Sequence, residues 1–245
     1  MRRRPDGTLG LVGYAHWLAG QVLDVARVNR FWMTWNLILA FIPAGLAVVL
    51  FWRPHVRTVM WWFGVGCFAL FLPNAPYVLT DLIHLRWDAA RSASDGVLVF
   101  GVLPLYGLFV TLGMTSYVFC VALIVREVRT VRTSVARWQV ELPVHALCSL
   151  GIVLGRITRL NSWDTITQPR GTLESIFATL TWRGAPFAFA AVFIAVFASY
   201  TVFRALLVAG ASWGGGWARR LGWVDGAGGG HGPGDATTPA SATPF

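Results

Sequence analysis

A run of polar residues follows a pair of prolines in the first half of the chain. Asn74, Tyr77, Asp81, His84 and Asp88 recur at intervals of three and four positions, which places them on one face of a helix. A carboxylate one turn from an imidazole can transfer protons at neutral pH, and the two groups can bind a divalent metal if further ligands are present. Asp81 and His84 are therefore candidate catalytic residues and candidate metal ligands. The alternative is an amphipathic interfacial helix whose polar face meets only water.

A second polar cluster ends a later apolar segment and consists of Arg156, Arg159, Asn161 and Asp164. A charge in a membrane helix is costly unless it pairs with an opposite charge or reaches the interface. Arg159 is close enough to the end of the segment to reach the lipid head groups. Arg156 lies a turn deeper and needs an anion: Asp164, an aspartate of the first cluster, or the phosphate or carboxylate of a ligand.

The elements that carry these residues are apolar. Of the 245 residues, 56% are hydrophobic and 13% are charged. This composition excludes a water-soluble globular domain, a disordered chain and a disulfide-linked secreted domain. Twenty basic residues, all arginine, outnumber eleven acidic ones. Because they flank or interrupt apolar segments, they indicate contact with membrane lipids rather than nucleic acid. The Arg, Ala, Gly and Val content suggests a GC-rich bacterial source, hence the plasma membrane.

We expect an all-α fold, a polytopic bundle of about five transmembrane helices. The predicted spans are 35–52, 57–73, 97–125, 141–160 and 185–207, and a short amphipathic or re-entrant helix covers 74–88. Pro73 and Pro76 end the second span, and Asn74 is expected to cap the short helix. Residues 34–209 form the transmembrane domain. Residues 1–33 are a basic segment with an interfacial helix, and residues 210–245 are a disordered tail rich in Gly, Pro, Ala and Thr.

The order of the spans brings the two polar clusters together. The second span ends at the first cluster, the third crosses away and the fourth returns to the second cluster, while Trp35 and Asn36 begin the first span on the same face. We therefore expect a convergent polar site at one membrane face. The residues expected to bind substrate there are Asn74, Tyr77, Arg156, Arg159, Asn161 and Asp164. Gly151 and Gly155 form a GxxxG pair, which permits close helix approach.

Three segments carry a resemblance to a known family. They read WNLILAFIP at 35–43, FLPNAPYVLTDLIHL at 71–85 and LGRITRLNSWD at 154–164. The chain resembles a family of uncharacterised prokaryotic multi-pass membrane proteins, a domain of unknown function, over about residues 34–205. Members often have Trp-Tyr-Asp where this chain has Arg86-Trp87-Asp88. The resemblance implies a shared membrane fold and no particular activity.

Three classes of function fit this sequence. The first is a multi-pass membrane protein that acts as an enzyme on a lipid-linked or phosphorylated substrate. The second is a small transporter or permease component, and the third is a scaffold whose polar groups pair with one another. No P-loop, HExxH or GxSxG motif is present. A divalent metal is a candidate cofactor, membrane lipids are the expected partners, and the sequence does not set the oligomeric state. Glu141 and His145 are interpreted as an interfacial acid and a core histidine.

Overall fold

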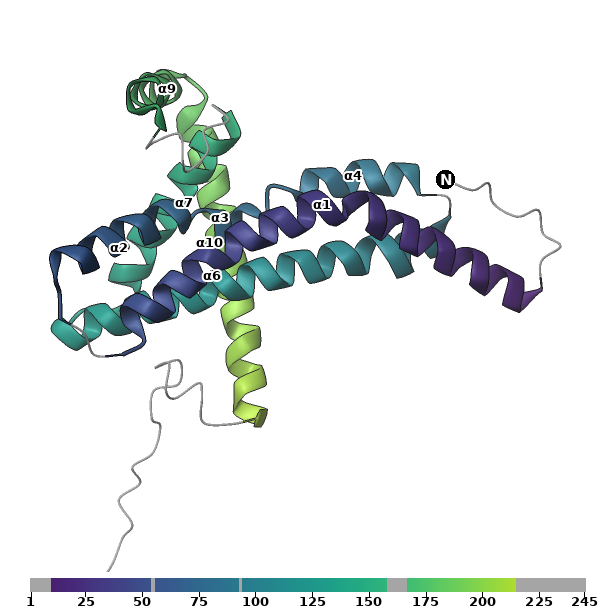
Figure 1. Ribbon diagram of the computed structural model, residues 1–245, viewed down its shortest axis with the longest axis horizontal. Coiled ribbons are helices and arrows are strands. Elements are labelled where there is room, and N and C mark those ends of the chain that lie inside the picture. The colour runs from purple at the N-terminus through teal and green to yellow at the C-terminus, as the bar shows by residue number, and fades with distance from the viewer. Residues whose placement is uncertain (1–9, 54–55, 93, 158–166, 215–245) are drawn as a thin grey trace, which may run out of the picture.

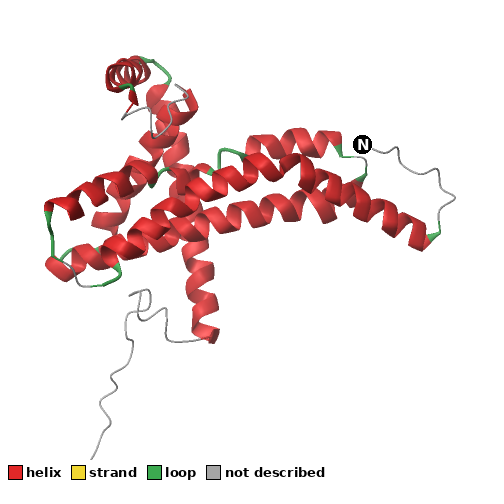
Figure 2. Cartoon of the chain, in the orientation of Figure 1, coloured by secondary structure: helices red, strands yellow, loops and turns green. Residues whose placement is uncertain are grey.

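The computed structural model describes residues 10–53, 56–92, 94–157 and 167–214, and within these ranges every regular element is a helix (Figures 1 and 2). The helices, in chain order, are α1 (Leu11–Phe51), α2 (Val59–Phe71), α3 (Asn74–Tyr77), α4 (Leu82–Arg91), α5 (Asp95–Val97), the π-helix η1 (Leu98–Val102), α6 (Leu103–Val131), α7 (Arg137–Ile157), α9 (Pro169–Thr181) and α10 (Ala185–Gly214). Among the described residues, five helical stretches are long and apolar enough to cross a membrane. The predicted all-α transmembrane fold is confirmed.

The first helix is longer than the sequence suggested. We expected a separate interfacial helix before residue 34, but α1 continues through this position for 41 residues. No glycine or proline interrupts it between Gly20 and Pro43, and the polar side chains Gln21 and Asn29 are buried against the protein. At 1.5 Å per residue α1 extends about 60 Å, twice the hydrocarbon thickness of a bilayer. Asn36 therefore lies inside a continuous helix and not at the start of one.

The predicted helix at 74–88 is two short helices, α3 and α4, joined by a turn at 78–81. Pro73 and Pro76 have no N–H to donate to a continuing helix, and the turn is closed instead by bonds from Leu79 N to Pro76 O and from Thr80 N to Tyr77 O. Asn74 does not cap α3, because it is the first residue of this helix and its Nδ2 donates to the carbonyl of Phe71 at 2.9 Å. The prediction of one continuous polar face was thus wrong.

The third span begins with a local irregularity that the sequence marked. Gly101 and Pro104 lie at this point of the sequence, and the π-helix η1 occupies Leu98–Val102. Pro104 lacks the N–H that would bond to Phe100, so the helix starts with wider turns, and Leu103 N donates to Leu98 O. From Leu103 onward α6 is regular and central, with Tyr106, Met114 and Tyr117 fully buried.

The chain is arranged as a long hairpin crossed by later helices. In Figure 1, α2 and α4 run alongside α1 with α3 between them, and α6 runs along the other side of α1. Helices α7 and α10 pack against α6 and against each other, and α9 lies beyond the end of α7. Helix α9 was not predicted, and α10 extends to Gly214, into the segment assigned to the tail. The rest of that tail lies outside the described residues.

Two connections meet at one end of the bundle. The α1–α2 and α6–α7 turns are joined by an ion pair of 2.7 Å between Arg57 and Glu127. Arg126 adds hydrogen bonds to the carbonyls of Phe51 and Trp52. These contacts fix how far α1, α2 and α6 are shifted along one another, and so determine which residues of the three helices lie side by side farther along.

Candidate functional site

Asp81 is the buried centre of the candidate site. Its side chain is only 5% exposed, and it lies in the turn between α3 and α4, where bonds to the third preceding residue replace those of an α-helix. One carboxylate oxygen, Oδ2, accepts a 3.0 Å hydrogen bond from Asn36 Nδ2 of α1. The other, Oδ1, lies 3.6 Å from Arg156 Nη1 of α7. Three elements far apart in sequence therefore meet at one carboxylate.

Arg156 completes this junction from the end of α7. Its Nη2 donates to the carbonyl of Thr80 at 3.1 Å, and its Nη1 is 3.4 Å from the hydroxyl of Tyr77. The guanidinium carbon also lies 5.8 Å from the centre of the Tyr77 ring, a cation–π distance. The side chain remains 37% exposed, so part of the guanidinium is available to another anion. The expectation that Arg156 pairs with an acid is met by Asp81.

The close approach of α7 to the turn depends on glycine. A Cβ on Gly151 would lie 2.6 Å from Cγ of Pro73, and a Cβ on Gly113 of α6 would lie 2.6 Å from Val78. Both distances are below any normal carbon–carbon contact. Gly151 therefore acts as the GxxxG pattern suggested, since it lets α7 reach the turn that presents Asp81.

A second carboxylate is held farther along α4. Asp88 Oδ2 accepts hydrogen bonds from Asn29 Nδ2 at 2.7 Å and from the hydroxyl of Tyr106 at 3.1 Å. Asn29 Oδ1 in turn accepts from Trp32 Nε1 at 2.8 Å. Asn29 was not predicted from the sequence, although it precedes Asn36 by seven residues, the spacing of one helical face. Two asparagines at this spacing in an apolar helix were the signal for a polar seam along α1.

His84 is placed apart from Asp81. It is exposed, and its ring packs beside that of Trp32 with 5.0 Å between centroids. Within the described residues the two side chains share no hydrogen bond; the link is from the backbone N–H of His84 to the carbonyl of Asp81. Asp81 meets donors from α1 and α7, whereas the exposed ring of His84 lies against Trp32 of α1.

Part of the predicted site cannot be placed. Arg159, Asn161 and Asp164 lie outside the described residues. In the part of the chain that is described, no three His, Cys, Asp or Glu side chains gather as a metal would require. The structure therefore brings together Tyr77, Asp81 and Arg156. Asn74 begins the short helix that carries Tyr77, and it is tied to the preceding turn by its bond to Phe71.

A separate polar group lies between α6, α7 and α10. His145 is fully buried, and its Nδ1 lies 2.6 Å from the hydroxyl of Tyr117. Tyr200 donates to Glu141, which also pairs with Arg137. The rings of His145 and Tyr200 are 4.5 Å apart. These contacts fit the interpretation of His145 as a core residue, because its Nδ1 bonds to α6 and its ring packs against α10.

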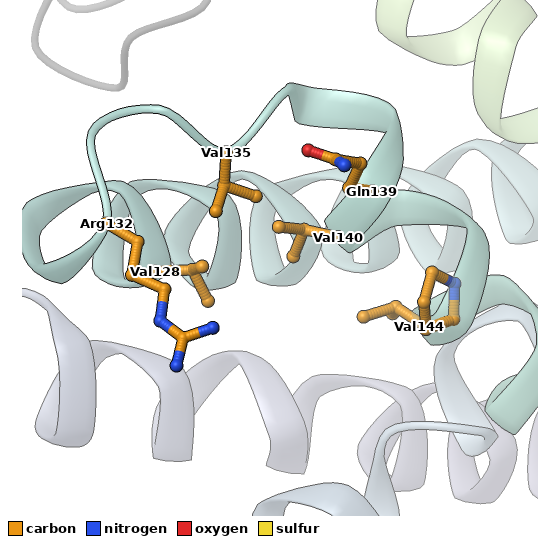
Figure 3. A pocket seen from close by; sticks show the side chains of 7 residues that line it. Val128, Arg132, Val135, Gln139, Val140 and Val144 are labelled. Carbon is orange, nitrogen blue, oxygen red and sulfur yellow. The ribbon is translucent and has the colours of Figure 1, made fainter.

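A surface hollow of about 480 Å³ lies elsewhere, where α6 turns into α7 (Figure 3). Its lining combines the end of α6 with the first turns of α7: Val128, Arg132, Val135, Gln139, Val140, Pro143 and Val144. None of these residues belongs to the Asp81 site, which lies toward the other end of α7.

The apolar helices and the contact between Asp81 and Arg156 define a multi-pass membrane protein with charged side chains at a break in one of its spans. Residues 35–198 match the family described as "Protein of unknown function (DUF1361)", and the chain belongs to this family. The resemblance to a membrane-protein family of unknown function is thereby confirmed. No curated protein and no solved structure matches the chain significantly.

Proposed function

We propose that the protein is a bacterial plasma-membrane enzyme that binds a lipid-linked or phosphorylated substrate at Arg156. The observation that carries this proposal is the half-exposed guanidinium, held in place by Asp81, Tyr77 and the Thr80 carbonyl at a helix break. An arginine has five N–H donors in a planar fork suited to phosphate. With the other side of the fork anchored, the exposed donors are preorganised for an anion, so less conformational entropy is lost on binding.

The roles of the other residues follow from their positions. Asp81 is a positioning residue, because both of its oxygens face protein donors. His84 is the exposed group that can carry a proton to or from a substrate at neutral pH. Tyr77 lines the anchored side of Arg156, and Asn74 begins the same short helix. Three residues beyond the described end of α7 are proposed from the sequence to complete the substrate site: Arg159, Asn161 and Asp164.

A transporter is the second candidate, and the broken α2–α3–α4 segment favours it. Discontinuous membrane helices form substrate sites in many transporters because they expose backbone groups inside the bilayer. Here the break carries a buried carboxylate and lies against an arginine from another helix. The same geometry would suit coupled movement of an anion.

The enzyme and the transporter both require an anion site at Arg156, and binding of an anionic head group tests this site. Purified protein is titrated with a short-chain phosphatidic acid and with phosphatidylcholine of the same chains, and bound lipid is counted by native mass spectrometry. We expect Arg156→Gln to weaken phosphatidic acid binding about tenfold or more, since a charge-assisted hydrogen bond contributes about 1.5–3 kcal/mol. The matched control is Arg183→Gln, an exposed arginine between α9 and α10. Equal binding by both variants would refute the proposed anion site.

His84→Ala separates the two candidates. An enzyme should keep lipid binding and lose conversion of the phosphorylated lipid, followed by mass change of that lipid. A transporter should convert nothing and should instead move labelled phosphate or lipid across proteoliposomes. If the His84→Ala variant kept full conversion of the phosphorylated lipid, His84 would have no role in the reaction.

A further inference from the structure

We propose that the hollow between the end of α6 and the start of α7 is a binding site for an anionic phospholipid of the bilayer. This site lies at the opposite end of α7 from Arg156. Because α7 has 21 residues, the two ends are about 30 Å apart, the thickness of the hydrocarbon core. The inference is therefore independent of the proposed substrate site and concerns the other membrane face.

The lining of the hollow has an apolar part and a polar part, as the chains and the head group of a lipid require. Five of its seven residues are valine or proline: Val128, Val135, Val140, Pro143 and Val144. The two polar ones, Arg132 and Gln139, come from the connecting turn and from the first turn of α7. In Figure 3, Arg132 lies at one end of the labelled side chains and Val144 at the other, with valines between them. An acyl chain can lie along the valines while its phosphate meets Arg132.

Both polar residues have donors left for a phosphate. Gln139 uses its side-chain oxygen to accept a 2.8 Å bond from Ala136 N, which leaves its amide NH₂ to donate. Arg132 is exposed, and among the described residues no carboxylate lies within ion-pair distance of it. The nearby acids are already engaged, Glu127 by Arg57 and Glu141 by Arg137. The hollow therefore presents an uncompensated positive charge beside a neutral donor.

The position of the hollow matches the level of lipid head groups. It lies where one membrane-spanning stretch ends at Val131 and the next begins at Arg137. Trp138, 61% exposed, and Trp52, 43% exposed, are found at this end of the bundle, as interfacial tryptophans are. The volume of about 480 Å³ falls within the range of about 300–1,000 Å³ for small-molecule sites, which suits a head group with the upper part of its chains.

Competitive lipid binding tests this site in the full-length protein. Delipidated protein is titrated with phosphatidylglycerol and with phosphatidylcholine of identical chains, and each bound lipid is counted by native mass spectrometry. We expect one phosphatidylglycerol to bind in preference to phosphatidylcholine. Arg132→Gln should weaken this binding about fivefold, which corresponds to the binding free energy that one arginine contributes near a membrane surface. Arg129→Gln is the matched control, because Arg129 is an exposed arginine of the same turn region that does not line the hollow.

Two further measurements make the result decisive. Val144→Phe, which fills the apolar end of the hollow, should weaken both lipids alike in a variant that keeps its melting temperature. Inorganic phosphate alone should bind at least a hundredfold more weakly than phosphatidylglycerol, because it cannot use the valines. Equal loss in Arg129→Gln and Arg132→Gln would show general surface attraction and overturn the site. Equal affinity for phosphatidylcholine, or for free phosphate, would overturn it as well.

Discussion

At the scale of single residues, Asp81 and Arg156 differ in their access to water. The side chain of Asp81 is 5% exposed and that of Arg156 is 37% exposed. A buried charge that loses its partner keeps its desolvation cost, whereas an exposed one can be hydrated. The two halves of the ion pair should therefore respond unequally to substitution, although the same contact is removed.

This asymmetry gives a prediction for stability. Arg156→Gln should lower the free energy of unfolding by about 2–3 kcal/mol, less than the about 3–5 kcal/mol of a fully buried pair. Asp81→Asn should lower it by about 1 kcal/mol, because Asn36 can still bond to the amide oxygen. The measurement is unfolding in mixed detergent–SDS micelles, and the double variant should be less destabilised than the sum of the two.

The exposed pair between Asp24 and Arg27 supplies the control. Its side chains are 47% and 69% exposed, so Arg27→Gln should change stability by well under about 1 kcal/mol. If the Asp81 and Arg156 substitutions change the free energy of unfolding as little as this control does, and are strictly additive, the junction is solvated and does not stabilise the protein.

At the scale of elements, the sequence predicted where helices break better than where they continue. Pro73, Pro76 and Pro104 lack a donor, and at these positions α2 ends and the start of α6 widens. Pro43 and Pro143, by contrast, stand inside the continuous helices α1 and α7. The continuity of α1 through Asn36 depends instead on tertiary partners: Asp81 and Asp88 satisfy the polar side chains of α1. Such partners are invisible to a local pattern. The convergence of Asn36, Asp81 and Arg156 was predictable because the order of the spans brings them to one face, whereas the contact of the His84 ring with Trp32 was not.

The contact of α7 with the helix break yields a prediction at this scale. Gly151→Ala should destabilise the protein by about 1–3 kcal/mol, since the added Cβ would lie within 2.8 Å of two atoms of the Pro73 ring. That ring has little freedom to move aside. Thermal unfolding in detergent is the measurement, and lipid binding at Arg156 should weaken as α7 moves away from the turn.

Gly45 provides the matched comparison in α1. A Cβ at this position meets nothing within 4 Å, so Gly45→Ala should leave the melting temperature unchanged or raise it, as replacement of a helical glycine by alanine contributes up to about 1 kcal/mol. A similar response in the two variants would mean that Gly151 has no packing role.

At the scale of the whole molecule, the two ends of the bundle differ in charge density. The end where α1 meets α2 and α6 meets α7 holds arginines in a compact group: Arg53, Arg57, Arg126, Arg129, Arg132 and Arg137. The other end also carries arginines, but Arg156 there pairs with Asp81. An arginine that is paired within a site contributes less to the membrane orientation than an unpaired one. Short connections that are rich in arginine tend to lie on the cytoplasmic side. We therefore expect the compact arginine end to be cytoplasmic and the Asp81 site to face outward.

Cysteine accessibility in intact cells tests this orientation. Val131→Cys, at the exposed end of α6, should react with a membrane-impermeant maleimide only after the cells are permeabilised. Ala90→Cys, exposed on α4, should react from outside. The wild-type chain is a suitable background because Cys120 and Cys148 are buried and Cys67 is half-buried within the apolar helix α2. Labelling of position 131 from outside would reverse the orientation: the proposed lipid site would then face the outer leaflet, and the Asp81–Arg156 site would draw its substrate from the cytoplasm.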